Sequence, residues 1–159
     1  MINLSVKKVV LCFFILLLNS CGGCDHCDDQ PVLYNYSIQN NSGAKVEIIP
    51  YIINSSGIEK MVLAEKITIE DSKSFSKEFK DLAPYDGFNF NDFLKYPSKI
   101  DIVFNNSKKI TYEICSFNGV LCNNPRNIFN PEFNNEINEV YKITTSDLQN
   151  AFSCSGNCY

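Results

Sequence analysis

The 159-residue chain contains a single histidine, His26, and no tryptophan. A Ser-His-Asp or Cys-His catalytic arrangement requires an imidazole that packed structure holds within about 3 Å of its nucleophile. His26 instead lies near the N-terminus, in a short segment rich in glycine and aspartate. Such a segment cannot hold an imidazole in place, so the sequence argues against histidine-based hydrolysis.

Other catalytic patterns are also missing. The chain has no glycine-rich phosphate loop, no HExxH helix and no calcium-loop pattern. Paired carboxylates could still support glycoside chemistry. The candidates for that role, Glu65, Glu70 and Asp71, stand where surface charge is expected. We therefore expect a protein that is not an enzyme, with no catalytic residues, no cofactor and no metal site.

A basic surface is the third missing feature. Removing residues 1–20, which have the pattern of a targeting segment, leaves 12 basic and 18 acidic residues and a formal net charge of −6. No basic patch remains to bind nucleic acid. The length and the 45% hydrophobic content fit one small globular domain, and they exclude a disordered chain.

Residues 1–20 contain the three parts of a secretory signal peptide. Lys7 and Lys8 form a basic region, residues 9–18 are an unbroken apolar run, and the small residue Ser20 follows. Ten apolar residues, at about 1.5 Å of helical rise each, span roughly half of a ~30 Å hydrocarbon core. The segment is therefore expected to be a signal peptide and not a transmembrane helix.

The junction Leu18-Asn19-Ser20-Cys21 resembles the lipobox of bacterial lipoproteins, in which an aliphatic residue stands three positions before an invariant cysteine. The resemblance implies cleavage before Cys21 and acylation of this cysteine, palmitate included, so that lipid chains attach the protein to a membrane. In Gram-negative lipoproteins an Asp after the lipidated cysteine marks the inner membrane. Gly22 stands there, which implies the outer membrane. The alternative is an ordinary signal peptide with a cysteine near the cleavage site by chance.

With Cys12 in the signal peptide and Cys21 lipidated, an even number of cysteines remains. In an exported chain this predicts disulfides, because the compartment is oxidising. Local pairs, 24–27, 115–122 and 154–158, are favoured by proximity. The alternative is a long-range bridge from 115 or 122 to 154 or 158. The disulfide candidates are Cys24, Cys27, Cys115, Cys122, Cys154 and Cys158.

The segment Cys24-Asp25-His26-Cys27 has two functional alternatives, a redox pair and a metal site. Carboxylates at Asp25, Asp28 and Asp29 raise the pKa of neighbouring thiols, which opposes a reactive thiolate. Its thiolates, imidazole and carboxylates suit a metal, yet structural zinc sites usually take a second ligand pair from elsewhere in the fold. We expect a disulfide or a passive role within a lipidated flexible tether over residues 21–31.

Residues 32–159 carry the apolar alternation of β-strands and form the predicted single domain. Turns rich in Asn, Ser and Gly at 40–43, 54–57 and 105–108 predict hairpins. About seven short strands with no long amphipathic helix predict an all-β, antiparallel two-sheet sandwich, Ig-like or transthyretin-like. A short helical turn over 147–152, capped by Thr145 or Ser146, follows the last strand. The expected strands lie near 32–38, 44–48, 66–69, 75–79, 99–104, 109–115 and 140–143.

The residues from Val140 to Ala151 resemble the ending of many small uncharacterised Gram-negative lipoproteins. This second resemblance implies no activity.

Two segments interrupt the strands. Residues 84–97 are dense in aromatics, and residues 116–138 hold asparagine at eight positions together with Pro125 and Pro131. Aromatic side chains on such loops could stack on a glycan or anchor a protein partner. Alternatively, Phe93 and Leu94 lie on a helical turn that plugs one end of the sandwich, and the loop aromatics hold the second segment down. The possible contact residues are Tyr85, Phe88, Phe90, Phe129 and Phe133.

These features together predict a lipid-anchored, non-enzymatic lipoprotein of the outer membrane, on its periplasmic face or at the cell surface. It would act as a binding or structural accessory module for an unknown protein or glycan, through loops at the end away from the tether. The alternative is a periplasmic inhibitor or immunity lipoprotein against a secreted toxin, which the acidic charge and compact disulfide-bonded core also fit. A cell-envelope enzyme is the third possibility.

Overall fold

A computed structural model describes residues 30–115, 122–134 and 136–159. Residues 31–159 form one compact unit. The predicted signal peptide, Cys21 and the Cys24–Cys27 pair lie outside the described residues. The elements are β1 (Val32–Asn41), β2 (Val46–Ile53), β3 (Glu59–Met61), the 3-10 turn η1 (Leu63–Glu65), β4 (Ile67–Ile69), β5 (Ser74–Asp81), α2 (Phe90–Phe93), β6 (Lys99–Phe104), β7 (Lys108–Glu113), the 3-10 turn η2 (Pro131–Phe133), β8 (Asn138–Thr144), α3 (Thr145–Asn150) and β9 (Phe152–Ser153).

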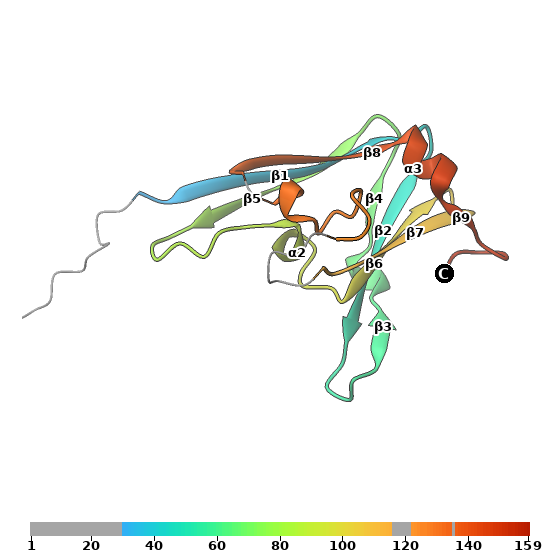
Figure 1. Cartoon of the computed structure of the whole chain (residues 1–159), viewed down its shortest axis with the longest axis horizontal. Coiled ribbons are helices and arrows are strands. Elements are labelled where there is room, and N and C mark those ends of the chain that lie inside the picture. The colour runs from blue at the N-terminus through green and yellow to red at the C-terminus, as the bar shows by residue number, and fades with distance from the viewer. Residues whose placement is uncertain (1–29, 116–121, 135) are drawn as a thin grey trace, which may run out of the picture. The chain divides into compact units, whose positions relative to one another are not determined.

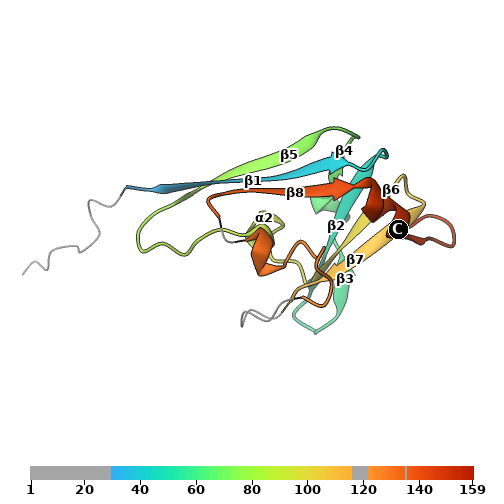
Figure 2. The ribbon, with the colours of Figure 1, turned by 45° about the horizontal axis from the view of Figure 1, so that its top comes forward.

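The described strands form two sheets, as predicted for an all-β sandwich (Figure 1). The smaller sheet has the order β5-β1-β8, and the larger has the order β3-β2-β6-β7-β9, with β4 also paired to β2. Figure 2 shows α2 and the segment that contains η2 in the space between the two sheets. The fold therefore packs its apolar side chains between two β-layers.

The alternation of apolar and polar residues explains which side chains of the smaller sheet are buried. In β1, Tyr36 and Ile38 are fully buried, whereas Leu33 is exposed on the other face. Tyr141 and Ile143 continue this buried face on β8. Side chains two residues apart share one face of a strand, so each strand presents one face to the core and one to water.

The larger sheet is buried on both faces of its central strand. Ile100 and Ile102 of β6 belong to the main core. Val103 faces the other way and packs with Ile49 and the C-terminal Cys158 in a second apolar cluster. The C-terminal segment therefore covers part of the outer face of this sheet, and five of the six residues of β6 are buried.

The predicted hairpin between residues 32–38 and 44–48 is wrong, because β1 and β2 belong to different sheets. At the corner between them, the buried Asn40 amide donates to the carbonyls of Ala44 (2.7 Å) and Ile69 (2.9 Å) and accepts from Ser42 N (3.0 Å). This one side chain satisfies backbone groups where the chain leaves one sheet for the other. The same Asn-Asn-Ser-Gly sequence suits a hairpin turn equally well.

One strand pair departs from the predicted antiparallel arrangement, since β8 pairs with β1 in parallel. Parallel neighbours require a long crossover connection, and the whole chain between β1 and β8 supplies it. The hairpin of β6 with β7 and the turn at 54–57 are confirmed. The C-terminal helix is present, but Thr144 caps it and Asp147 completes the capping box, so it begins before the residues expected.

Candidate functional site

The predicted contact aromatics are mostly core residues. Phe90 of α2 is fully buried, with its ring 5.0 Å from that of Tyr36. Phe88 stacks on Phe79 at 4.7 Å, and both Phe88 and Phe129 are buried. Phe133 is partly buried against the core. Of the five predicted contact residues, Tyr85 alone is exposed, because the aromatic segment packs between the sheets.

The alternative prediction for residues 84–97, a helical turn at Phe93 and Leu94 that fills the sandwich, is confirmed. Phe93 lies on α2 and Leu94 directly after it, and both are buried. Asn89 caps the helix by accepting from the amide of Asn91 at 2.8 Å. The Phe93 ring meets Phe75 of β5 edge-on at 5.7 Å. A single helical turn thus fills the space that the two sheets leave open.

The asparagines of residues 122–134 build local turns. Asn124 Oδ1 accepts from the amide of Arg126 at 2.9 Å, and Asn127 Oδ1 accepts from that of Phe129 at 3.1 Å. Both are side-chain bonds to a backbone two residues on, the geometry of Asx turns. The side chains therefore take the place of strand hydrogen bonds in a segment where proline excludes a central strand.

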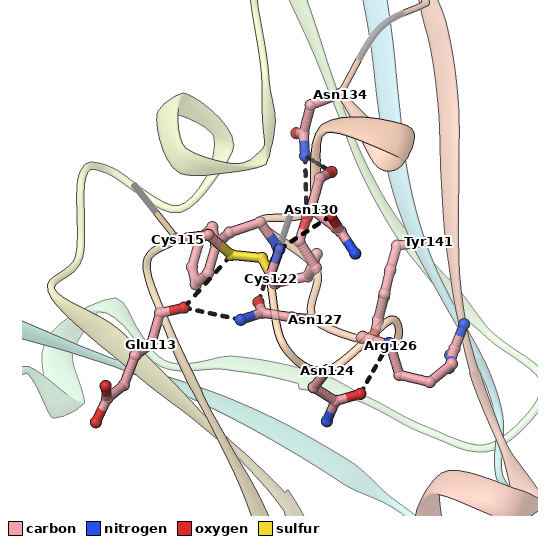
Figure 3. Close-up of a disulfide and its surroundings, with 11 residues drawn as sticks. Glu113, Cys115, Cys122, Asn124, Arg126, Asn127, Asn130, Asn134 and Tyr141 are labelled. Carbon is pink, nitrogen blue, oxygen red and sulfur yellow. Dashed lines mark hydrogen bonds between the residues drawn. A yellow bond between two sulfur atoms is a disulfide. The ribbon is translucent and has the colours of Figure 1, made fainter. Parts of the chain in front are cut away.

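Other asparagine amides connect this segment to its neighbours (Figure 3). Asn127 Nδ2 donates to the carbonyl of Glu113 on β7 at 2.8 Å. Asn134 accepts from the amide of Phe90 at 2.6 Å and donates to the carbonyl of Asn130 at 2.8 Å. Residues 122–134 are therefore a folded part of the domain, and their asparagines are structural.

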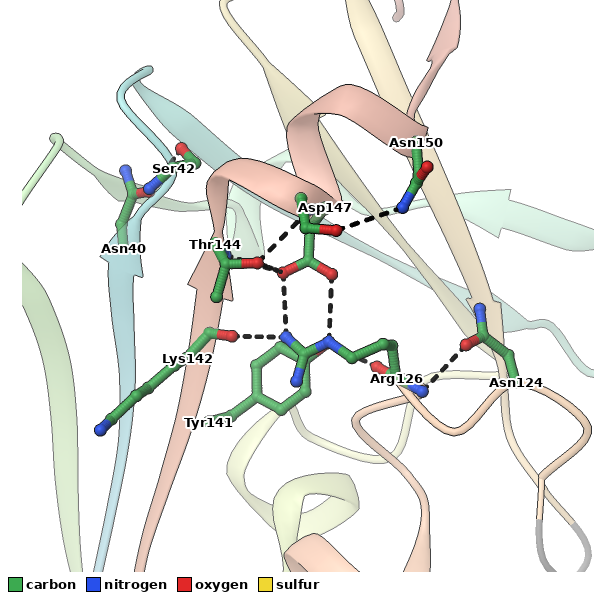
Figure 4. Close-up of polar contacts among 10 residues, drawn as sticks. Asn40, Ser42, Asn124, Arg126, Tyr141, Lys142, Thr144, Asp147 and Asn150 are labelled. Atoms are coloured by element: carbon green, nitrogen blue, oxygen red, sulfur yellow. Dashed lines mark hydrogen bonds and ion pairs between the residues drawn. The ribbon is translucent and has the colours of Figure 1, made fainter.

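Arg126 fastens the same segment to the last helix (Figure 4). Its Nε and Nη2 donate to the two Asp147 oxygens at 3.1 and 2.9 Å, and Nη2 also donates to the carbonyl of Lys142 at 2.5 Å. The guanidinium lies 5.0 Å from the centre of the Tyr141 ring. Burial raises the pKa of Asp147, but the Arg126 and Thr144 hydrogen bonds outweigh it, so the pKa lies below its usual value.

Both predicted disulfides in the described residues are present. Cys115 pairs with Cys122 and Cys154 with Cys158, each with a Cα–Cα distance of 5.3 Å. This distance lies within the normal range for disulfides. Local pairing is therefore confirmed over the long-range alternative. The first bridge closes the base of the asparagine-rich segment, and the second holds the C-terminus against the larger sheet.

The three carboxylates considered for catalysis have separate surroundings. Glu65 forms an ion pair with Lys95. Asp71 accepts from the amide of Gly43 at 2.8 Å, and Glu70 is exposed. Across residues 30–115, 122–134 and 136–159, no three His, Cys, Asp or Glu side chains gather closely enough to bind a metal ion. None of the described helices is long and apolar enough to cross a membrane.

An exposed apolar hairpin is present that was not predicted from the sequence. β2 and β3 form an arm that projects from the rest of the domain in Figure 1. Ile53 and Ile58, on either side of its turn, are 61% and 63% exposed. In both ribbon views the tip of this arm, called the isoleucine hairpin below, lies apart from the start of β1. The signal was available, since Ile52-Ile53 and Ile58 flank the predicted turn at 54–57.

A pocket of about 310 Å³ opens where η1, β4 and β5 meet the end of α2. Its apolar lining includes Ile67, Phe75, Phe93 and Leu94. Charged side chains also line it, and they are Glu65, Lys66, Lys77 and Lys95. Apolar walls combined with a few polar groups are typical of small-ligand sites. This pocket, called the lysine pocket below, was not predicted from the sequence.

Lys77 is the distinctive residue of the lysine pocket. It occupies an inward position of β5, between Phe75 and Phe79 in the alternation. Its ammonium donates to the carbonyl of Phe93 and lies 4.7 Å from the centre of that ring. Burial lowers the pKa of Lys77, and the charge of Lys95 lowers it further. Within the part of the chain that the structure describes, no carboxylate forms an ion pair with this ammonium.

The other two lysines of the pocket are paired. Lys95 forms its ion pair with Glu65. Lys66 turns to the outer face of the larger sheet, where its Nζ donates to Glu47 and to the Tyr159 hydroxyl, each at 2.9 Å. Among the described residues that line the pocket, Lys77 is therefore the cation without a carboxylate partner.

Comparison with protein-family models, curated proteins and solved structures finds no match to this chain.

Proposed function

We propose that the protein is a lipid-anchored, non-enzymatic lipoprotein of the outer membrane, and that its β-sandwich serves as a binding module. The basic region, apolar run and Cys21 in lipobox position support the anchor. Two disulfides support an oxidising compartment. The acidic net charge disfavours nucleic acid as a partner.

A short tether would keep this module close to the membrane. β1 begins at Val32, eleven residues after Cys21. Eleven residues reach at most about 40 Å when fully extended. A partner of the domain would therefore be a molecule of the envelope or one that arrives at its surface.

The isoleucine hairpin is the observation that carries the binding role. Apolar side chains so exposed at a projecting tip are costly in water and mark interaction sites when they cluster. Ile53 and Ile58 are exposed on either side of the turn, Ile52 beside them is 42% exposed, and their arm lies apart from the start of β1. A protein surface with an apolar recess is the partner that fits them.

Labelling with a palmitate analogue tests the anchor. The wild-type chain should take up label, and Cys21→Ala should take up none. Cys12→Ala is the matched control, because it changes a cysteine within the same N-terminal region and should leave labelling intact. A Cys21→Ala chain that still acquires label would refute the anchor at this position, and an unlabelled wild-type chain would favour an ordinary signal peptide.

Site-specific crosslinking in intact cells tests the binding role. A photo-reactive side chain at Ile58 should yield a defined crosslinked protein, and the same group at Ser76, on the outer face of β5, should not. Ile53→Ser placed in the Ile58 crosslinking chain should abolish the product while changing the stability by less than about 0.5 kcal/mol. Equal products from both positions would reject the hairpin as the contact surface.

An inhibitor or immunity lipoprotein is the second candidate, because a projecting hairpin has the shape to enter a concave active site. Brief protease treatment of intact cells separates the two possibilities. An inhibitor acting in the periplasm should be protected until the outer membrane is opened. A chain degraded on intact cells is displayed at the surface, which rejects the periplasmic inhibitor.

A further inference from the structure

We infer that the lysine pocket binds a small monocarboxylate with an apolar body. This site is separate from the isoleucine hairpin, and the inference depends neither on the hairpin nor on the lipid anchor. Three observations lead to it: the charge of the pocket, the free hydrogen-bonding capacity of Lys77, and the apolar lining.

The charge of the pocket fits one carboxylate. Glu65 neutralises Lys95, and Lys66 is committed to Glu47 and Tyr159 on the other side of the sheet. Counted over the described residues of its lining, the pocket therefore has an excess of one positive charge, on Lys77. A monocarboxylate balances this charge, whereas a phosphate group would bring more negative charge and meets no arginine fork here.

The ammonium of Lys77 has N–H donors that can bind a ligand. An ammonium has three N–H donors, and the carbonyl of Phe93 takes one of them. The remaining two suit the oxygens of a carboxylate. Charge-assisted hydrogen bonds are about twice as strong as neutral ones, and partial burial reduces the screening by water that weakens them at exposed sites.

The apolar lining of the lysine pocket favours a ligand with an apolar tail. Ile67, Phe75, Phe93 and Leu94 line the pocket beside the ammonium. The volume of about 310 Å³ lies at the lower end of the range for small-ligand sites. A short aliphatic carboxylate fits both the apolar lining and the volume. Its tail would contact the aromatic and aliphatic side chains, and its carboxylate would bind Lys77.

Nuclear magnetic resonance titration of residues 30–159 with hexanoate tests this inference. This fragment contains the complete described core and all described strand pairs. Hexanoate should give saturable shifts at residues that line the pocket, and hexanamide and hexylammonium should bind at least about tenfold more weakly, the loss expected for one charge-assisted hydrogen bond. Hexanoate should also raise the pKa of Lys77, because a nearby negative charge favours the ammonium form.

A pair of variants on β5 supplies the control. Lys77→Met keeps the length of the side chain without its charge, and should weaken hexanoate binding by about 10- to 100-fold. Lys80→Met changes an exposed lysine of the same strand and should leave binding unchanged. Equal affinities for hexanoate and hexanamide, saturable shifts elsewhere, or no saturable shifts at all would overturn the inference. The ligand comparison uses the wild-type chain, so it decides the matter even where Lys77→Met fails to fold.

Discussion

Replacing Arg126 with methionine should destabilise the domain through Asp147. The side chain of Asp147 is only 8% exposed, and its carboxylate accepts two hydrogen bonds from the Arg126 guanidinium. Methionine preserves much of the apolar contact with Tyr141 but leaves that carboxylate without a cation. Thr144 still donates to it through its amide and hydroxyl, at 2.7 and 2.8 Å. In the variant the carboxylate therefore loses its two hydrogen bonds from Arg126 but keeps those from Thr144.

The magnitude follows from the exposure of the two partners. Removing one partner of a fully buried ion pair costs about 3–5 kcal/mol, whereas an exposed pair contributes about 0–1 kcal/mol. The Arg126 side chain is 38% exposed, so solvent screens part of the interaction. We expect Arg126→Met to lower the free energy of unfolding by about 2 kcal/mol at pH 7, between these limits.

The effect of Arg126→Met should depend on pH with a definite sign. The folded-state pKa of Asp147 lies below its ordinary value of 3.8, so its contribution is fully present above that pH and is lost as the pH falls through the folded pKa. Without Arg126 its hydrogen bonds and positive charge no longer lower that pKa, so the pKa of Asp147 should rise relative to the wild-type protein. The difference between the wild-type and variant proteins should therefore be largest near neutral pH and shrink below about pH 4.

Urea denaturation followed by circular dichroism measures the difference at pH 7 and at pH 3. Lys142→Met is the matched control, because this neighbouring lysine has an exposed side chain and its loss should cost less than about 0.5 kcal/mol. A double-mutant cycle with Asp147→Asn isolates the pairwise energy. A coupling energy near zero, or a destabilisation by Arg126→Met that is the same at both pH values, would refute the reasoning.

Three further changes can be checked by the same denaturation measurement. Asn134→Ala should cost about 2–3 kcal/mol, because it leaves an amide of α2 unpaired; the exposed Asn150→Ala should cost little, and equal losses would contradict the structural role. Replacing Cys115 and Cys122 together by serine should cost about 2.5 kcal/mol of loop-closure entropy, and no loss would mean that the bridge does not constrain the unfolded chain. Lys77→Met should be at least as stable as the wild type, because burial disfavours its ammonium; a clear loss would show that the charge stabilises the fold.

Local patterns were sufficient to predict most strands of this domain. The alternation in residues 99–104 and the turn at 105–108 predicted β6 and its hairpin with β7, and the spacing of cysteines predicted both bridges. These features depend on residues close together in the chain, so their chemistry is visible in the sequence. The corner at Asn40 and the parallel partner of β1 depend on distant residues. The same turn and the same alternation are compatible with either arrangement.

The aromatic segment shows why contact loops are hard to predict. Phe88 and Phe90 stand among Pro, Gly and Asn residues, which are typical of a surface loop. The two sheets diverge, however, and α2 fills the space between them. Whether a loop aromatic is a core residue or a contact residue thus depends on the angle between sheets, which no local pattern contains.

Both proposed binding surfaces lie where the residue type conflicts with its position in the fold. Lys77 takes an inward place on β5 that the alternation gives to an apolar side chain, and Ile53 and Ile58 take outward places at a turn where polar residues are the rule. Local and global preferences agree along β1, β6 and β8, where the core is built. Natural sequences tolerate such conflicts chiefly at functional sites. The inward lysine and the outward isoleucines are therefore the positions at which selection for binding, rather than for stability, best explains the residue.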